Sequence, residues 1–479
     1  MRGLLASSVG VTCAAALALP LTSPAVAARP VSPAAVRPAP GAEALGSTQS
    51  LPLAPLASRD RTLAPVAEQG LPRRDVRHFS LVGVIWDDPD AVLNGRVQVR
   101  TRAVGADIWS GWQDLETHND DAADPGTAER TSGRVHGATA PLWVGDSDGV
   151  EVRVRAEADR RTEDTARGSR TATTTAPLPA GLRLELVDPG ESAPVPAREE
   201  SAAGASQRAV APRPAPAPAP TADDADADAD AAMDASAANA DLAGLGATEI
   251  PALDRQQTEE EMFALRAAEL TGQQRVKPYI GPRPRIVTRY GWGADEGLRE
   301  RSFVYTKKVK AAFVHHTASG NGYRCTQAAS LIRGIYRYHV KSMGWRDIGY
   351  NFLVDKCGNI YEGRAGGVAK PVLGAHTLGF NSNSMGIAVL GSYGSKKPSA
   401  AATLAIAQLT AWKLGLHGAN PKGKTYLKSG GGNLYPKGKK VRLNVISGHR
   451  DGFATECPGR QLYRKLGSTR TTAARLQGR

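Results

Sequence analysis

Two histidines and a cysteine, far apart in the chain, have the side chains of a metal site. His315 ends a short apolar run, and His449 and Cys457 lie eight residues apart in a loop rich in Gly and Pro. Two imidazoles and a thiolate suit Zn²⁺, and three protein ligands leave a fourth position for water, which is the catalytic pattern. By spacing alone, the same residues also fit a core histidine and a free thiol.

The cysteine count favours the ligand interpretation for Cys457. Cys13 falls within an expected signal peptide, so three cysteines remain, an odd number for a protein of an oxidising compartment. Cys325 and Cys357 flank an expected helix and the first strand of a hairpin, and we expect a disulfide between them. An unpaired thiol is a liability in an exported protein, so Cys457 is better explained as a ligand.

Residues 1–27 have the pattern of a secretory signal peptide. Arg2 precedes an apolar core, and Ala25-Val-Ala27 is a small-residue cleavage site. The apolar stretch is shorter than the ~20 residues that span a bilayer. We therefore expect an extracellular protein without a transmembrane segment.

The elements that would position the ligands lie in residues 278–470. Residues 311–317 predict a buried strand that ends at the histidine pair, residues 348–362 predict a hairpin, and residues 385–390 predict another strand. Thr326 and Ser399 could each cap a helix. This order predicts an α/β domain with a mixed central β-sheet flanked by helices.

The rest of the chain is expected to hold one further domain. We predict an Ala/Pro-rich stalk, a small all-β domain, a disordered linker rich in Ala, Pro and Asp, and a short tail, at residues 28–77, 78–188, 189–277 and 471–479. A short helix could lie at residues 258–270. We expect the acidic run at residues 222–231 to be solvated rather than a calcium site. Four tryptophans of the β domain, at positions 86, 109, 112 and 143, favour a packed core over a sugar-stacking surface.

The net charge of +13 is unevenly distributed. Residues 276–479 hold 34 Lys and Arg against 8 Asp and Glu, whereas residues 1–275 are net acidic. A basic module suggests an acidic partner. Nucleic acid is disfavoured, because the chain has no recognised nucleic-acid motif and is expected to be exported.

Residues 284–467 resemble the zinc amidase domain shared by peptidoglycan recognition proteins and phage-lysozyme-type N-acetylmuramoyl-L-alanine amidases. The resemblance rests on ordered motifs, which are Trp292-Gly-Ala294, Phe313-Val-His-His-Thr317, Asp347-Ile-Gly-Tyr-Asn-Phe352, Gly358-Asn-Ile-Tyr-Glu-Gly-Arg364, Gly374-Ala-His376, Asn381 with Gly386-Ile387, Gly448-His-Arg450 and Thr455-Glu-Cys-Pro-Gly459. It implies a secreted, wall-associated enzyme, expected to be a monomer, that uses Zn²⁺ to hydrolyse the amide between N-acetylmuramic acid and L-alanine of peptidoglycan.

The resemblance also implies roles for single residues. Zn²⁺ would be held by His315, His449 and Cys457, and the Tyr350 hydroxyl would assist the water or the developing oxyanion. Thr455 matches a position that is Lys in the phage enzymes and Thr in catalytic recognition proteins, which leaves the proton shuttle open. His316 should point to the other face of its strand. The substrate groove would include three further side chains, which could instead be a salt bridge, a satisfied histidine and a turn residue: Arg364, His376 and Asn381.

The alternative function is non-catalytic binding of peptidoglycan. Family members that only bind commonly lack the metal cysteine, whereas this chain has all three ligand positions and the tyrosine. Residues 365–371 depart from the family pattern, so the preferred stem peptide cannot be carried over. An insertion at residues 418–440 holds six lysines, at positions 422, 424, 428, 437, 439 and 440, which could bind anionic wall polymers or belong to a solvated β-ribbon. The β domain resembles accessory regions ahead of such amidases in exported bacterial proteins.

Overall fold

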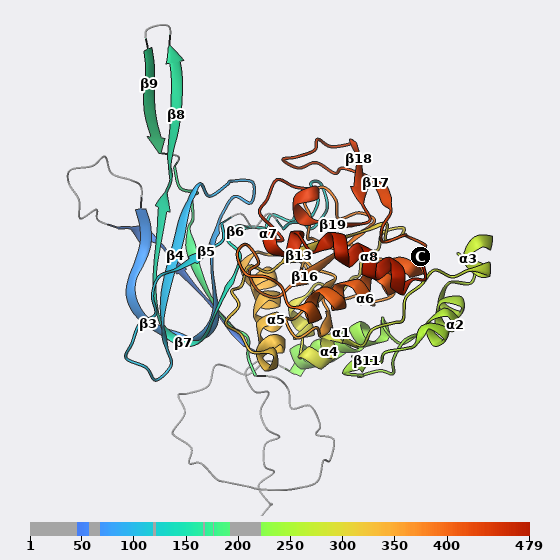
Figure 1. Ribbon diagram of the computed structural model, residues 1–479. Coiled ribbons are helices and arrows are strands. Elements are labelled where there is room, and N and C mark those ends of the chain that lie inside the picture. Colours follow the sequence, from blue (N-terminus) through green and yellow to red (C-terminus); the bar gives the residue numbers. More distant parts are fainter. Residues whose placement is uncertain (1–45, 57–67, 118–120, 166–167, 176, 192–221) are drawn as a thin grey trace, which may run out of the picture. The chain divides into compact units, whose positions relative to one another are not determined.

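The computed structural model describes residues 46–56, 68–117, 121–165, 168–175, 177–191 and 222–479 (Figure 1). The expected signal peptide, part of the expected stalk and the Pro-rich part of the expected linker lie outside the described residues. Within the described part of the chain, no helix is both long enough and apolar enough to span a bilayer.

The N-terminal domain is all-β, as expected. Its eight-stranded sheet has the order β1-β10-β3-β7-β4-β5, and β2 and β6 also pair with β3. The strands are β1 (Ser47–Pro52), β2 (Ala54–Pro55), β3 (Glu68–Trp86), β4 (Gly95–Ala103), β5 (Gln113–Leu115), β6 (Gly137–Ala138), β7 (Leu142–Ala156) and β10 (Arg183–Asp188), and β8 (Ala158–Thr165) pairs with β9 (Gly168–Thr175) as a separate hairpin.

The prediction of a stalk at residues 28–77 is wrong where the structure describes that range. β1 pairs with β10 along its whole length, and β3 begins at Glu68. Leu51 and Leu53 pack against the buried core of the β domain, which includes Phe79. Two or three apolar residues between prolines were too few to give a recognisable strand pattern, and the pairing partner lies more than a hundred residues away.

The tryptophans of the β domain have different environments. Trp86 is buried in the core, as expected. Trp109 and Trp112 are only half-buried. The guanidinium of Arg73 lies 5.1 Å from the Trp109 ring centroid, and that of Arg153 lies 4.1 Å from the Trp112 ring centroid. These two rings are therefore covered by cations rather than by apolar side chains, which corrects the core prediction for them.

The C-terminal domain has a seven-stranded mixed sheet with helices on both faces, in the order β11-β12-β15-β14-β16-β13-β19. Its main elements are β11 (Glu249–Ile250), β12 (Ile286–Val287), α4 (Arg289–Trp292), β13 (Ala311–His316), α5 (Ala328–Arg337), β14 (Phe352–Val354), β15 (Ile360–Glu362), β16 (Ser384–Val389), α6 (Ala400–Leu416), β19 (Ile446–Gly448), α7 (Arg460–Tyr463) and α8 (Leu466–Leu476). β13 is parallel to both β16 and β19. The predicted fold class is confirmed.

Both faces of this sheet are buried, which explains the nearly continuous apolar strands. Val314 packs in the cluster that contains α6, and Ala388 packs in the cluster that contains α5. The Ser399 side chain caps α6 by accepting a hydrogen bond from the Ala402 amide at 3.0 Å. The predicted Thr326 cap is wrong, because Thr326 lies in a 3-10 turn and α5 begins at Ala328.

The predicted linker at residues 189–277 is wrong for residues 222–277. These residues form α1 (Ala222–Ala237), β11, α2 (Arg255–Arg266) and α3 (Gly272–Val276). β11 pairs with β12 and so joins the sheet. In α1, Ala231 and Ala235 are buried although the run looked fully polar. Alanine has the highest helix propensity, and residues four apart share one helix face.

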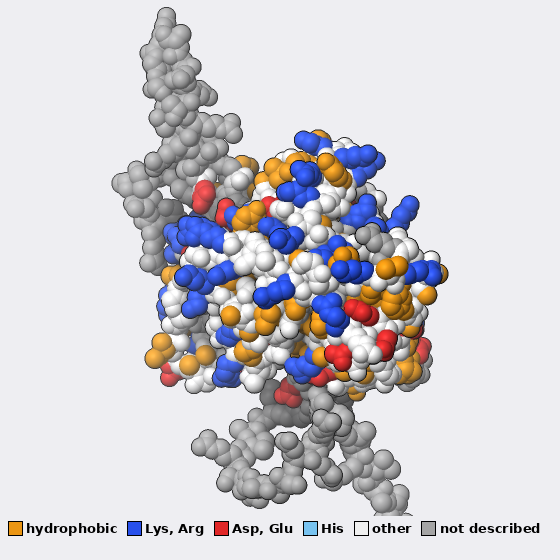
Figure 2. Space-filling view, turned by 45° about the vertical axis from the view of Figure 1, so that its right-hand side comes forward, with side chains coloured by type: hydrophobic (Ala, Val, Ile, Leu, Met, Phe, Trp, Pro, Cys, Tyr) orange, Lys and Arg blue, Asp and Glu red, His pale blue; other side chains and the backbone are white. Residues whose placement is uncertain are grey.

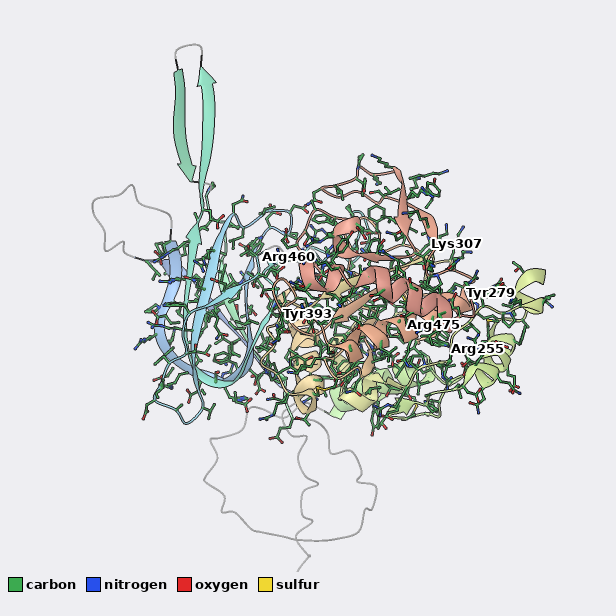
Figure 3. The ribbon with its side chains drawn as sticks, in the orientation of Figure 1. Arg255, Tyr279, Lys307, Tyr393, Arg460 and Arg475 are labelled. Atoms are coloured by element: carbon green, nitrogen blue, oxygen red, sulfur yellow. A yellow bond between two sulfur atoms is a disulfide. The ribbon has the colours of Figure 1, made fainter. Side chains whose placement is uncertain are left out.

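The expected tail at residues 471–479 is also wrong, because most of it belongs to α8. Ala473 and Ala474 are buried. Figure 3 shows Arg255 and Tyr279 beside the C-terminal end of this helix. Arg255 donates hydrogen bonds to the carbonyls of Ile280 and Leu476, so the start of α2 is fastened to the end of α8.

The insertion at residues 418–440 contributes to a two-stranded ribbon of β17 (Lys424–Lys428) and β18 (Lys440–Asn444). Leu427 and Leu443 pack in a small cluster with Phe313 and Phe380 of the main domain. The six lysines named above are all exposed. Figure 2 shows Lys and Arg side chains spread over the face in view, with fewer Asp and Glu side chains.

A disulfide joins Cys325 to Cys357, as expected. It ties the start of α5 to the turn between β14 and β15, across 32 residues of chain. Replacing both cysteines with Ser should lower the free energy of unfolding by about 2–4 kcal/mol, because the unfolded chain regains the entropy of the closed loop.

Urea titrations of the oxidised wild type and of the double variant measure this difference. Dithiothreitol should lower the free energy of unfolding of the wild type to that of the variant and leave the value of the variant unchanged. A wild-type transition that does not respond to dithiothreitol would contradict the stabilising role of the disulfide.

Candidate metal centre

His315, His449 and Cys457 meet at one edge of the C-terminal sheet. His315 lies at the end of β13, and His449 directly follows β19, its parallel neighbour. The carboxyl ends of adjacent parallel strands share one edge of a sheet, which brings the two imidazoles together. The candidate ligand atoms of the three residues lie within 4.8 Å of one another, and all three residues are buried.

The donor atoms fit a zinc ion. With Zn–N and Zn–S bonds of about 2.0–2.3 Å, ligand atoms on a tetrahedral ion lie roughly 3.3–3.8 Å apart. His315 Nδ1 lies 3.8 Å from Cys457 Sγ. Both ring nitrogens of His449 are buried without a hydrogen-bond partner among the described residues, which is rare for buried polar atoms. A cation bound at this place would give one of these nitrogens a partner.

The electrostatics of the ligands agree with this fit. Burial and the neighbouring His315 ring lower the pKa of His449 to about 3, so this imidazole is neutral, as metal binding requires. Burial raises the pKa of the Cys457 thiol well above its usual range. The thiolate that binds zinc therefore needs a cation beside it. The His316 amide donates to Cys457 Sγ at 3.4 Å and so supports the sulfur.

The His316 side chain points away from the cluster, as the alternation of a strand predicts. Its Nδ1 accepts a hydrogen bond from the Tyr393 amide at 3.2 Å, and its Nε2 lies 3.4 Å from a carboxylate oxygen of Glu116. Of the two adjacent histidines, only His315 offers a nitrogen to the cluster. The expected packing or hydrogen-bonding role of His316 agrees with these contacts.

Tyr350 and Thr455 both lie near the cluster. The Tyr350 ring centroid is 5.6 Å from that of His315. Burial raises the pKa of the Tyr350 hydroxyl well above its usual range, so this group remains a hydrogen-bond donor. Thr455 is half-buried, and its hydroxyl accepts a hydrogen bond from the Cys457 amide at 3.2 Å.

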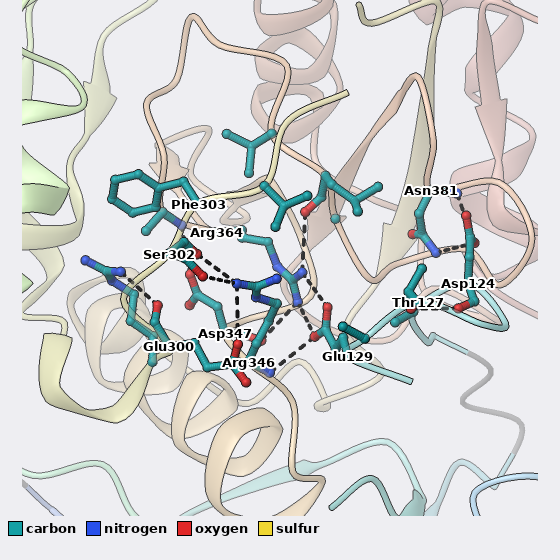
Figure 4. Close-up of a pocket in the computed structure, with 18 residues that line it drawn as sticks. Asp124, Thr127, Glu129, Glu300, Ser302, Phe303, Arg346, Asp347, Arg364 and Asn381 are labelled. Carbon is teal, nitrogen blue, oxygen red and sulfur yellow. Dashed lines mark hydrogen bonds and ion pairs between the residues drawn. The ribbon is translucent and has the colours of Figure 1, made fainter. Parts of the chain in front are cut away.

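Two of the three predicted groove residues line a cavity of about 260 Å³ (Figure 4). These are Arg364, which follows β15, and Asn381. His376 is fully buried beside His315, with 5.3 Å between ring centroids, and does not line this cavity. Burial lowers the pKa of His376 well below its usual range. The Thr377 hydroxyl lies 3.0 Å from His376 Nδ1 and 3.3 Å from His315 Nε2.

Sequence reasoning missed Asp121, which comes from the β domain between β5 and β6. Its Oδ1 lies 3.0 Å from His315 Nδ1 and 3.3 Å from His449 Nδ1. Its Oδ2 accepts a hydrogen bond from the Tyr350 hydroxyl at 2.6 Å. The only sequence signal is an acidic residue in a stretch without strand periodicity, and nothing in its spacing indicates a partner about two hundred residues away.

Both domains match known protein families. Residues 305–460 match the family "N-acetylmuramoyl-L-alanine amidase", and residues 33–178 match "Rv3811 N-terminal galactose-binding domain-like". Peptidoglycan-recognition protein SC2 of Drosophila simulans is 37% identical over 183 residues, which are 38% of this chain and 84% of that protein. Human N-acetylmuramoyl-L-alanine amidase is 32% identical over 185 residues, 38% of this chain and 27% of that protein.

Among solved structures, peptidoglycan recognition protein-LE in complex with tracheal cytotoxin is 31% identical, with a TM-score of 0.30, and the match covers 38% of this chain and 92% of that one. The match to the Drosophila simulans protein extends over most of that protein, and the region that matches the amidase family, residues 305–460, contains the two histidines, the cysteine and Tyr350. By this similarity the chain belongs to the family of peptidoglycan-recognition proteins and N-acetylmuramoyl-L-alanine amidases.

Proposed function

We propose that the protein is a secreted, zinc-dependent amidase that hydrolyses the amide bond between N-acetylmuramic acid and L-alanine of peptidoglycan. The observation that carries the proposal is the buried cluster of His315, His449 and Cys457, in which neither His449 nitrogen has a hydrogen-bond partner from the described residues. A protein that only binds peptidoglycan does not require such a cluster. The cell wall is the proposed location, and its anionic polymers are proposed partners of the exposed lysines at residues 422–440.

Each group of the site has a place in the hydrolysis. His315, His449 and Cys457 would hold Zn²⁺, which would supply a Lewis acid for activating water and polarising the scissile carbonyl. The protonated Tyr350 hydroxyl donates to the oxyanion that develops on the carbonyl oxygen. Arg364 and Asn381 orient the substrate from the adjoining cavity. The leaving amine of L-alanine needs a proton, and in this proposal the Thr455 hydroxyl positions a water that delivers it.

Mass spectrometry of products from purified walls tests the proposed reaction. The zinc-loaded full chain should release stem peptides with a free L-alanine amine and leave intact N-acetylmuramic acid on the glycan. Products with new reducing sugar ends, or peptides cut within the stem, would contradict the assignment. Wall binding without any product, in every variant described below, would favour the non-catalytic alternative.

Tyr350→Phe should lower kcat roughly 10²-fold, which is the usual effect of removing one donor to a developing oxyanion. The zinc content should stay at the wild-type level, because the hydroxyl is not one of the three proposed ligands. Turnover of a soluble muropeptide and metal analysis of the purified protein measure the two quantities.

Tyr361→Phe is the matched control. Its hydroxyl donates to Asp355 at 3.0 Å, away from the metal cluster, so this variant should keep its turnover. An undiminished kcat in the Tyr350 variant, or an equal loss in both, would remove the proposed role of Tyr350.

A further inference from the structure

We propose that residues 121–130, here called the strap, make the enzyme latent by occupying its groove and by supplying Asp121 as a fourth ligand to the metal. The strap belongs to the β domain, yet its acidic side chains contact the metal cluster and the groove residues of the other domain. The inference rests on the proposed function, because latency has meaning only for an active site.

The first step is the position of the Asp121 carboxylate. Its Oδ1 lies 3.0 and 3.3 Å from the Nδ1 atoms of His315 and His449, which is at or slightly below the separation of two ligands on one ion. This oxygen is buried and has no hydrogen-bond partner within the part of the chain that the structure describes. A fourth protein ligand closes the coordination shell, and closed shells are typical of structural rather than catalytic zinc. With Asp121 in place, the position for water is taken.

The second step concerns the proposed oxyanion donor. The other oxygen of Asp121, Oδ2, accepts the Tyr350 hydroxyl at 2.6 Å. The same donor is needed by a substrate carbonyl during hydrolysis. One carboxylate of the strap therefore takes the open metal position and also binds the Tyr350 hydroxyl, which would otherwise stabilise the developing charge.

The third step concerns the groove. Glu129 receives both terminal nitrogens of Arg364, at 2.9 and 2.8 Å, and Figure 4 shows this pair beside the cavity. Asp124 Oδ1 accepts from the Asn381 side chain at 2.7 Å and from the Gly379 amide at 2.8 Å. The Ala122 carbonyl accepts a second bond from Asn381 at 2.8 Å. The strap thus holds the two predicted substrate contacts that face the cavity.

The fourth step is that the strap borders two cavities, although Ala123 of the strap also packs in the hydrophobic cluster that includes Trp345. A cavity of about 260 Å³ is lined by Asp124 and Glu129 of the strap, and another of about 130 Å³ is lined by Asp121 and Ala122. The contacts that hold the strap are mainly carboxylates on polar donors, for which water or an anionic substrate can substitute. Peptidoglycan stem peptides carry carboxylates, so a substrate would compete with the strap for the same groups.

Two strap variants of the full chain test the proposal. Asp121→Ala opens the metal, and Asp124→Ala/Glu129→Ala frees the groove without touching the metal cluster. Asp114→Ala, which removes an exposed partner of Arg96 in the same β domain, is the control. In a latent enzyme only the open molecules bind substrate, so the apparent affinity is lowered in proportion to the fraction of molecules that are open. We expect muropeptide affinity, measured by calorimetry, to rise about 10- to 100-fold in the Asp124/Glu129 variant and to stay unchanged in the control.

The metal itself gives a readout that does not depend on activity. In the Co²⁺-loaded chain, azide should change the visible spectrum of the Asp121 variant and not that of the wild type or the control, because only the variant has an open position. The rate of hydrolysis should rise at least about tenfold in both strap variants, because it increases in proportion to the fraction of molecules that the strap no longer blocks. If Asp121 were a metal ligand with a purely structural role, its replacement would lower the rate of hydrolysis instead of raising it.

The outcomes separate the strap from the amidase. Azide access in the wild type together with unchanged muropeptide affinity in the Asp124/Glu129 variant would overturn the strap, even if all proteins cleave walls equally. Strap variants that gain azide and muropeptide binding but release no product would support the strap and contradict the amidase. If Asp121→Ala fails to fold, the Asp124/Glu129 variant decides by its affinity alone.

Discussion

Cys457→Ser is expected to abolish zinc binding and wall hydrolysis together. The serine oxygen is a poor ligand in place of a thiolate, and the two imidazoles left behind cannot hold a catalytic zinc with the same affinity. The metal supplies several kcal/mol of transition-state stabilisation, and each 1.36 kcal/mol is a factor of ten in rate. The rate should therefore fall by at least about 10³-fold. Metal analysis and the rate of muropeptide release measure the two effects.

The Cys325→Ser/Cys357→Ser variant is the matched control, because it makes the same chemical change away from the metal cluster. It should keep its zinc content and its turnover in the absence of denaturant, although it is less stable to urea. Full zinc content and full turnover in the Cys457 variant would exclude the thiolate as a ligand. Retained zinc with lost turnover would instead indicate that the sulfur acts in the reaction and not in binding.

The metal cluster could be predicted because its residues stand at the ends of strands. His315 ends an apolar run, and the Gly-rich loop that carries His449 and Cys457 follows another. The edge of a parallel sheet then brings distant residues together. Asp121 could not be predicted in this way, because it belongs to a segment without periodicity in another domain. Its partners are set by the packing of two domains, for which a local pattern has no signal.

The fold shows the same contrast between local and distant causes. The helix after Ser399 was predictable, since its cap and its apolar residues lie within one segment. α1 was not, because alternating Ala and Asp show no apolar face in the sequence, and small alanines such as Ala231 are buried only by the packing of the whole domain. β1 was missed because its partner, β10, is distant in the sequence. Short or unusual segments took their structure from partners that composition does not identify.

Arg289→Met is expected to lower the free energy of unfolding by about 3–5 kcal/mol. The guanidinium is buried and lies 2.6 Å from a Glu296 oxygen and 3.2 Å from an Asp347 oxygen. It also donates to the Gly363 carbonyl at 2.5 Å. Removing one partner of a buried ion pair leaves uncompensated charge, whose desolvation costs more than the pair contributed. Urea titration of the full chain measures the loss.

Arg285→Met makes the same substitution four residues earlier, at the surface. Arg285 and Glu249 are paired at 2.7 Å, but their side chains are 51% and 41% exposed. Such a pair contributes at most about 1 kcal/mol, because water and salt screen it. Similar losses in the two variants would mean that the buried ion pairs of Arg289 contribute no more to the free energy of unfolding than a surface pair does. A much larger loss for Arg289 would show that its buried ion pairs stabilise the chain around Gly363. The next residue, Arg364, reaches the groove from there.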